Sequence, residues 1–232
     1  MYSLIPIGFV ESKLKERYEA PHQGVFGGDT NSVIRLERNR NFEQALKDLE
    51  GFEKIWVIYL FHLNDSWKPL VTPPRNDGKK VGLFASRSPH RPNGIGLSCV
   101  TLNRIEGLDI HISNSDILDG SPVLDIKPYL PWSDSFPESK TGWAKTGERT
   151  VYAIEFSENA LTICNRIFEE DGVNLTGYAR VQLAFDPSDT TRKRINQVST
   201  DEFGLTYRNW QIIYMIDESK LRVLITNIVI RG

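Results

Sequence analysis

The apolar residues of this 232-residue chain fall into short runs that are separated by turn-forming residues. The runs in the N-terminal half have the length of strands and are rich in β-branched and aromatic side chains. Alternation is clearest at Leu108, Ile110 and Ile112, which are interleaved with polar residues. Several short strands at a spacing of roughly 8–12 residues predict an antiparallel barrel or sandwich rather than a βαβ array. The runs cover 4–10, 55–61, 81–85, 95–102, 108–113 and 122–126.

A helix and a connector complete the N-terminal half. Apolar residues at helical spacing before Gly51 predict a helix over about 41–50. Residues 128–147 are rich in Pro, Ser, Trp, Lys and Gly and have no periodicity, which indicates an exposed connector. We therefore expect a first domain at 1–140 and a second at 148–232.

The distal segment predicts a small α+β domain. Residues 158–170 carry apolar side chains at approximately helical spacing, and Gly172 is a suitable helix stop. The runs at 177–185, 210–217 and 220–230 are interpreted as strands. The sequence as a whole thus predicts a mainly β protein with a larger antiparallel β domain followed by a smaller α+β domain.

Charge and cysteine content exclude some classes of protein. The 28 Lys and Arg residues nearly balance 30 Asp and Glu residues, so there is no global positive field to gather nucleic acid, although local patches remain possible. Cys99 and Cys164 belong to no CxxC or Cys/His cluster, so neither a zinc site nor a disulfide framework is indicated, and a reducing, cytoplasmic setting is expected. The N-terminus does not resemble a signal peptide, and the longest apolar stretch, 55–63, is too short to span a bilayer.

Basic residues concentrate in one segment. Residues 68–91 carry six basic side chains against the single acid Asp77, which is about +5 locally. A second basic cluster is Arg192, Lys193 and Arg194. Both clusters can hold a phosphate backbone, and both can equally be solvated loops. The basic residues of the first segment are Lys68, Arg75, Lys79, Lys80, Arg87 and Arg91.

The sequence SRSPHRPNGIGL at 86–97 is the densest chemical feature of the chain. Pro89 and Pro92 stiffen the backbone, and Gly94 permits shapes that other residues avoid. A stiff loop of this kind opening into a strand is expected to present Arg87 and Arg91 to a carboxylate or a phosphate. The alternative is a purely structural turn. The loop has neither the Walker A pattern nor the spacing of a dinucleotide-binding glycine motif.

Other candidate residues are more isolated. His22, in a predicted loop, and His62, at the end of an apolar strand, can each stack on a ligand or be ordinary hydrogen-bonded residues. A turn is predicted at Asp119-Gly120, and the period-2 spacing places Asp125 and Lys127 on one face of the strand that follows. A neighbouring pair of opposite charges is also common on solvated faces.

Two long motifs carry a resemblance to a known family. FASRSPHRPNGIGLS at 84–98 and LDGSPVLDIKPYLPW at 118–132 resemble the paired hallmark of the TsaA-like or TrmO family of tRNA (adenine(37)-N6)-methyltransferases. The resemblance covers roughly 1–135 and extends more loosely to AFDP at 184–187 and to 203–217. Four shorter segments occur in the order that the family shows, namely IGFVES at 7–12, APHQG at 20–24, GFEKIWVIYLFH at 51–62 and PPRNDGKKVGLFA at 73–85.

The resemblance implies a fold, a reaction and a set of residues. It implies a single β-barrel, a homodimer without a metal, and methyl transfer from S-adenosyl-L-methionine to N6 of threonylcarbamoyl-adenosine 37 in threonine tRNA. By the resemblance, Asp125 and Lys127 extend the wall of the cofactor site. The chemistry of the reaction calls for an acceptor of the N6 proton, and we expect Asp125 in that role. The cofactor-binding residues that it implies are Pro21, His22, Gln23, His62, Leu63, Arg87, Arg91, Thr101, Leu102, Asp119, Gly120, Ser121, Pro122, Val123 and Leu124.

The chain departs from the family pattern at two points, and two rival functions remain. Gly94 replaces a proline of the arginine loop, and Asp186-Pro187 runs into Ser188-Asp189 instead of the family's Arg-Pro-Ala, which leaves the RNA contacts of the distal domain open. The rivals are a non-catalytic RNA- or nucleotide-binding barrel and a methyltransferase that acts on a small molecule or a protein.

Overall fold

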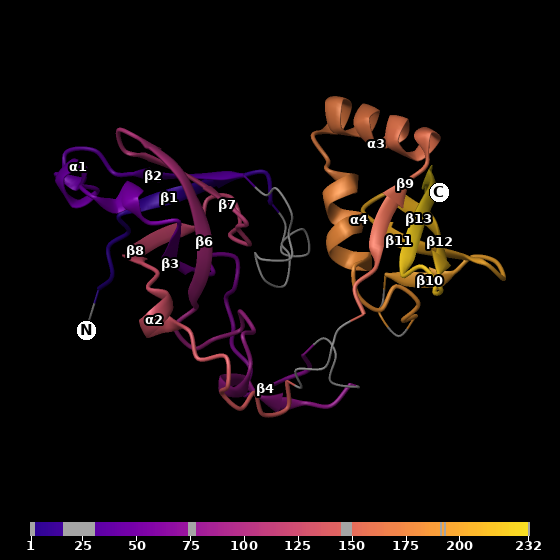
Figure 1. Ribbon diagram of the computed structural model, residues 1–232, viewed down its shortest axis with the longest axis horizontal. Helices are drawn as coiled ribbons and strands as arrows, with labels where there is room; N and C mark the ends of the chain where they lie inside the picture. The colour runs from indigo at the N-terminus through magenta and orange to yellow at the C-terminus, as the bar shows by residue number, and fades with distance from the viewer. Residues whose placement is uncertain are drawn as a thin grey trace. The chain divides into compact units, whose positions relative to one another are not determined.

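The computed structural model describes residues 3–15, 31–73, 78–144, 150–190, 192 and 194–231. The chain divides into two compact units, Met1–Lys145 and Thr146–Gly232 (Figure 1). The division falls within the segment whose composition indicates a connector.

Six strands of the first unit close into a barrel (Figure 1). Around the barrel the order is β1-β2-β7-β6-β3-β8, and each pair of neighbours is antiparallel. Because β1 also pairs with β8, the sheet has no free edge. The prediction of an antiparallel barrel is therefore confirmed. The strands are β1 (Gly8–Ser12), β2 (Ser32–Leu36), β3 (Lys54–Leu60), β6 (Ile95–Glu106), β7 (Asp109–Ser113) and β8 (Pro122–Pro128).

Alternate residues of the strands fill the barrel. On β3, Ile55, Val57 and Tyr59 are buried, whereas Trp56 and Ile58 between them are only partly buried. Full burial of an aliphatic side chain contributes roughly 1.5–3 kcal/mol, so the interior cluster is the main source of stability of this unit. The cluster is completed by Val10, Ile34, Leu36, Val100, Leu102, Ile110, Ile112, Ile117 and Val123.

The helix predicted over 41–50 is interrupted. It consists of α1 (Phe42–Ala45) and the 3₁₀ turn η2 (Leu49–Gly51), with Asp48 between them in the left-handed region at φ 65°. Left-handed backbone ends the helical hydrogen-bonding pattern. Phe42 and Leu49 still pack against the barrel core, so the apolar spacing marks packing residues rather than one continuous helix.

Shorter elements lie outside the barrel wall. The hairpin of β4 (Leu70–Val71) and β5 (Val81–Gly82) is followed directly by the 3₁₀ turn η3 (Leu83–Ala85), and α2 (Pro131–Asp134) follows β8. The predicted strand at 81–85 is therefore a strand only over its first two residues. The chain turns at Leu83 because that side chain is buried while its N–H donates to the Pro69 carbonyl at 2.9 Å.

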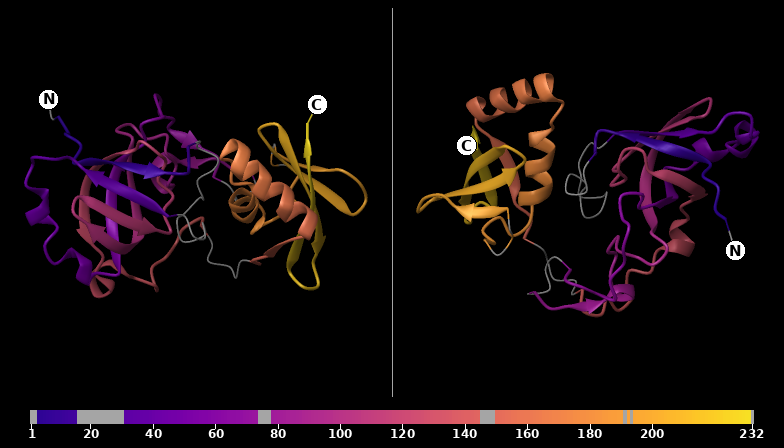
Figure 2. Two further views of the ribbon diagram at one scale, coloured as in Figure 1. Left: turned by 90° about the horizontal axis from the view of Figure 1, so that it is seen from above. Right: turned by 180° about the vertical axis from the view of Figure 1, so that it is seen from behind.

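The second unit is a five-stranded sheet with two helices on one of its faces (Figures 1 and 2). The strand order is β10-β11-β12-β13-β9, with β9 parallel to β13 and the other pairs antiparallel. This arrangement confirms the predicted smaller α+β region. The elements are β9 (Ala153–Phe156), α3 (Glu158–Asp171), α4 (Leu175–Leu183), β10 (Ile195–Gln197), β11 (Glu202–Tyr207), β12 (Trp210–Asp217) and β13 (Arg222–Ile230).

The two helices show one sequence prediction confirmed and one that is wrong. Helix α3 ends at Gly172 in the left-handed conformation, φ 68°, as its sequence indicates. Residues 177–185, interpreted as a strand, lie mostly in α4 instead. Leu175, Ala179 and Leu183 recur at helical spacing and are buried, and this packing overrides the strand-like composition. None of the helices among the described residues has the length and apolar character needed to cross a membrane.

Candidate active site

Three segments that are far apart in sequence meet at the end of β3. His62 follows this strand, and its ring Nδ1 lies 3.3 Å from the Ser121 hydroxyl oxygen, just before β8. The N–H of Phe61 donates to the Gly94 carbonyl at 2.7 Å, which attaches the arginine loop to the same strand end. The barrel thus brings together the two motifs that carry the family resemblance, on a rigid scaffold.

The turn at 119–121 is fixed against β1. The N–H of Gly120 donates to the Val10 carbonyl at 2.8 Å, and the Ser12 N–H donates to the Asp119 carboxylate at 2.9 Å. Gly120 has φ 72°, a conformation that glycine adopts without strain, as a turn at this position requires. A β-carbon at Gly120 would lie 3.8 Å from Nε2 of His62, so the imidazole ring covers the turn.

The two arginines of the rigid loop have different environments. The Arg91 guanidinium turns back and donates to the carbonyls of Ser86 and Ser88, at 3.0 and 3.3 Å. Pro89 and Pro92 have no N–H group to donate, and the Arg91 guanidinium adds side-chain hydrogen bonds to the backbone bonds that the Arg91 and Gly94 N–H groups make within the loop. Arg87 is exposed and has no hydrogen-bond partner among the described residues, so of the two it is the guanidinium available to an anionic ligand.

Asn64 and His90 are site residues that sequence reasoning missed. The Asn64 amide donates to the Pro89 carbonyl at 3.1 Å, which joins the segment after β3 to the arginine loop. Its Oδ1, and Nδ1 of His90, are buried and have no hydrogen-bond partner in the part of the chain that the structure describes. Buried polar atoms usually have partners, so these two atoms are a place where a ligand donor fits. The one sequence signal for this part of the site is that Asn64 lies two residues after His62.

Asp125 lies on the outer wall of the barrel, not at its end. Its Oδ2 is 2.8 Å from Lys127 Nζ, which confirms that the two side chains share one face. Asp125 stands opposite Ile58 on β3, and Ile58 stands opposite Leu97 on β6, whose surface is 60% exposed. The carboxylate therefore borders an apolar stretch of wall. The β3–β8 register shifts here, which leaves Leu124 as the extra residue of a bulge.

The structure separates two predicted cofactor residues from the others. Thr101 pairs with Lys54 at the start of β3, whereas His62 follows its end, and the Thr101 hydroxyl accepts hydrogen bonds from Lys54 and Asn114. The Leu102 side chain belongs to the barrel core, as does that of Val123. The sequence neighbours of His62 and of the 119–121 turn include three further predicted cofactor residues, Leu63, Pro122 and Leu124. Residues Pro21, His22 and Gln23 lie outside the described residues.

A polar cluster inside the barrel was also missed by sequence reasoning. The buried Ser98 hydroxyl donates to Asp116 Oδ1 at 2.5 Å and lies 3.4 Å from the Tyr59 hydroxyl. Burial, and secondarily the Asp116 charge, raises the pKa of Tyr59 well above its ordinary value, so this phenol stays protonated. Gly96 has no side chain here because a β-carbon would lie 2.5 Å from the Tyr59 ring.

The polar groups of this site suit a ligand that carries both a carboxylate and an amino group. Arg87 matches a carboxylate or phosphate, and Asn64 Oδ1 can accept from an amino group. Among the described residues no group of three His, Cys, Asp or Glu side chains is arranged to hold a metal ion.

Comparisons with known proteins extend this picture. The family model described as the tRNA-methyltransferase O N-terminal domain matches residues 9–135. A tRNA (adenine(37)-N6)-methyltransferase of Escherichia coli (strain K12) is 33% identical over 88% of this chain and 87% of its own length. A Pseudomonas aeruginosa protein, whose name assigns it to the S-adenosylmethionine-dependent methyltransferases, is 36% identical over 83% of this chain and 79% of its own.

Solved structures of TrmO match this chain over the residues of both units. The crystal structure of TrmO from Pseudomonas aeruginosa is 26% identical and has a TM-score of 0.69, covering 99% of each chain. The barrel, the loops at the end of β3 and these matches define a β-barrel methyltransferase. More specifically, the chain belongs to the tRNA-methyltransferase O family.

Proposed function

We propose that this protein transfers a methyl group from S-adenosyl-L-methionine to N6 of threonylcarbamoyl-adenosine 37 in threonine tRNA. The observation that carries the proposal is the meeting of His62, the 119–121 turn and the arginine loop at one end of β3, within the region that the family model matches. The names of the E. coli and P. aeruginosa relatives support a tRNA substrate and this methyl donor.

S-adenosyl-L-methionine supplies an electrophilic methyl group on a sulfonium centre. We assign Arg87 to its carboxylate, the unpartnered Asn64 oxygen to its amino group, and His62 with Ser121 to the polar edge of its nucleoside. Leu63 and Leu124 would line the same site. Arg91 has its guanidinium engaged by loop carbonyls, so its role is to hold the loop that carries Arg87.

Positioning is the main task of the protein in such a transfer, because the methyl group is already reactive. In this proposal the site extends from the barrel end onto the adjoining outer wall that carries Asp125, where it aligns the two reactants and keeps water away, which can supply a large part of the rate. The substrate N6 is a urea-type nitrogen whose lone pair is delocalised, so an acceptor for its proton assists attack. We assign this acceptor role to Asp125, whose Oδ1 accepts from the Ile126 N–H and whose Oδ2 pairs with Lys127.

The setting of the enzyme is also part of the proposal. We propose a homodimer in a reducing, cytoplasmic compartment, acting on the anticodon loop of the tRNA and needing no metal. Cys99 and Cys164 are free thiols, which supports a reducing setting. The exposed Leu97 and Ile95 on the outer wall of β6 support contact with a second copy.

Mass spectrometry of threonine tRNA tests the proposal. After incubation with protein and S-adenosyl-L-methionine, the threonylcarbamoyl nucleoside should gain the mass of one methyl group. Unchanged nucleoside, with the protein folded, would overturn the assignment. A non-catalytic binding barrel would bind the RNA without this gain, and a methyltransferase with another substrate would be stabilised thermally by S-adenosylhomocysteine without modifying the RNA.

The role of Asp125 is tested by substitution. Asp125→Asn should slow methylation by about 10²–10⁴-fold, the usual contribution of a general base, with cofactor binding retained. Glu138→Gln, which removes an exposed acid from the connector, is the matched control and should turn over normally. Near-normal turnover of Asp125→Asn would show that another group accepts the proton.

A further inference from the structure

Phe84 is a large apolar side chain that is held outside the protein by a well-fixed turn. Its surface is 80% exposed, whereas its neighbour Leu83 is only 2% exposed. The Leu83 N–H donates to the Pro69 carbonyl at 2.9 Å, and the Leu83 carbonyl accepts from both the N–H and the hydroxyl of Ser86, at 3.0 and 2.8 Å. These hydrogen bonds fix the backbone of the turn, and the fixed backbone keeps the Phe84 side chain exposed.

The connector fixes the same turn from another side. The indole N–H of Trp143 donates to the Ala85 carbonyl at 2.7 Å. Trp143 is 58 positions away in sequence and only partly exposed, so this bond attaches the chain that leaves the barrel unit to the turn that carries Phe84. Because the backbone that carries the Phe84 ring is already fixed, ordering this turn costs little conformational entropy when a partner binds.

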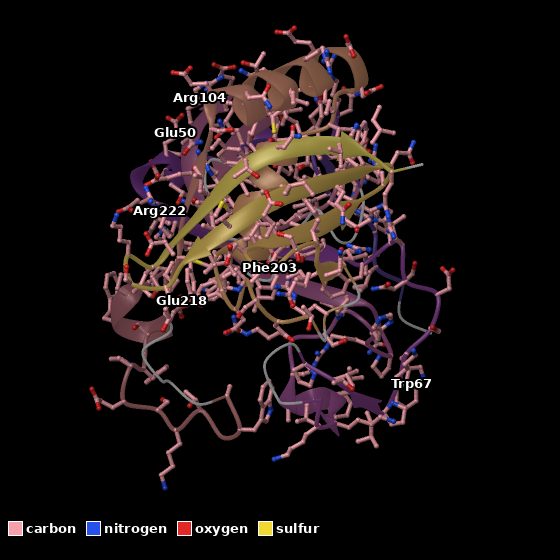
Figure 3. All side chains as sticks on the ribbon, turned by 90° about the vertical axis from the view of Figure 1, so that its right-hand side faces the viewer. Glu50, Trp67, Arg104, Phe203, Glu218 and Arg222 are labelled. Carbon is pink, nitrogen blue, oxygen red and sulfur yellow. The ribbon has the colours of Figure 1, made fainter. Side chains whose placement is uncertain are left out.

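The surroundings of Phe84 are cationic. The Arg91 guanidinium lies 6.0 Å from the ring centroid, over one face of the ring. The described parts of the surrounding segment, 68–73 and 78–91, contain no acidic residue. Trp67, 52% exposed, lies at the margin of the N-terminal unit (Figure 3). The basic residues of these parts are Lys68, Lys79, Lys80, Arg87 and Arg91.

An exposed ring on a fixed turn among basic residues fits a partner that combines negative charge with flat aromatic faces. Single-stranded nucleic acid has both, and proteins that bind it pair basic grooves with aromatic side chains on which bases stack. A second copy of this chain fits less well, because its own cationic segment would face the same charges.

We propose that Phe84 is a stacking platform for an unpaired base of the RNA substrate. This inference rests on the proposed function and adds a residue that positions the RNA beside the arginine loop. In this scheme Phe84 contacts the RNA and takes no part in the methyl transfer itself, so it acts on RNA affinity rather than on the chemical step.

Binding and turnover of threonine tRNA test the platform. Fluorescence anisotropy with labelled tRNA, in the absence of cofactor, gives Kd, and methylation gives kcat and KM. Phe84→Ala should raise Kd and KM about 5- to 150-fold, the usual effect of losing one base stack, while kcat at saturating tRNA changes little. Phe84→Trp should keep the affinity, and the new indole should lose emission intensity when tRNA is added.

Phe136→Ala is the matched control. Phe136 is 71% exposed but lies in the connector beside Ser135, with Asp134 and Glu138 close by in sequence, so its removal should leave Kd unchanged. Unchanged Kd for Phe84→Ala, or an equal loss for Phe136→Ala, would overturn the platform. So would a change of oligomeric state on Phe84→Ala, measured by light scattering, because Phe84 would then belong to a contact between copies.

The two proposals fail in different ways. If the wild type methylates tRNA and Phe84→Ala behaves like it, only the platform is wrong. If the wild type binds tRNA through Phe84 but adds no methyl group, only the proposed reaction is wrong. A wild type that does not bind tRNA overturns both.

Discussion

Ser121 and His62, which are 59 positions apart, contact each other through a hydroxyl oxygen and a ring nitrogen separated by 3.3 Å. The contact joins the end of β3 to the start of β8, two strands that pair along the barrel wall. It also places the imidazole over the turn at Gly120. An exposed histidine and a buried serine therefore act as one unit, with the serine fixing how the ring presents its second nitrogen.

Substitution of either residue should weaken cofactor binding. His62→Ala should raise the Kd for S-adenosylhomocysteine about tenfold, and Ser121→Ala should raise it less, because a neutral hydrogen bond is worth about 0.5–1.5 kcal/mol. Isothermal titration calorimetry measures both. Arg104→Ala, near the end of β6 that is farthest from His62, should leave the Kd unchanged; a wild-type Kd for His62→Ala would place the cofactor elsewhere.

Substituting the two arginines of the rigid loop should have different effects, one on thermal stability and the other on cofactor binding. Arg91→Ala removes a guanidinium that donates to two loop carbonyls and should lower Tm by about 3–8 °C, corresponding to about 1–2 kcal/mol. Arg87→Ala removes an exposed group, so it should leave Tm unchanged while weakening cofactor binding. Thermal unfolding with and without S-adenosylhomocysteine distinguishes them. Equal effects of the two substitutions would contradict this division.

Gly96→Ala should destabilise the barrel. A β-carbon at this position would lie 2.5 Å from a ring atom of Tyr59, whose surface is only 4% exposed, so the ring has little room to move. Overpacking of this kind costs about 1–3 kcal/mol. Gly51→Ala, where the new β-carbon meets no atom within 4 Å, should change the free energy of unfolding by less than about 0.5 kcal/mol in urea titrations. Similar urea midpoints for the two variants would count against this packing.

Acid should release the segment around α2. The Asp134 carboxylate accepts hydrogen bonds from the Leu130 N–H and from the Trp56 indole N–H, both at 3.0 Å, and these bonds lower the pKa of Asp134. A lowered pKa means that its stabilising contribution is complete above about pH 4 and is lost as pH falls through the lowered value. Tryptophan fluorescence should therefore change in that range. Asp134→Asn cannot titrate and should lack this transition; an identical acid profile would exclude Asp134 as its cause.

Much of the barrel was predictable because strand alternation is a local signal. The runs at 55–61, 95–102, 108–113 and 122–126 became β3, β6, β7 and β8 with small changes at their ends. Local signals failed where packing chose between two local structures. Residues 177–185 became part of a helix because Leu175, Ala179 and Leu183 bury one helical stripe.

The candidate site was predictable in its residue types but not in its geometry. The sequence by itself determined the β-rich architecture, the stiff arginine loop and the motifs of the tRNA-methyltransferase O family, since these depend on residue order. Only the tertiary structure decided that His62 meets Ser121, that Arg91 holds the loop while Arg87 stays available, and that Thr101 lies apart from them. The physical reason is barrel closure. Strand order and register bring distant segments to one end, and a loop's hydrogen bonds, rather than its charges, decide where a guanidinium points.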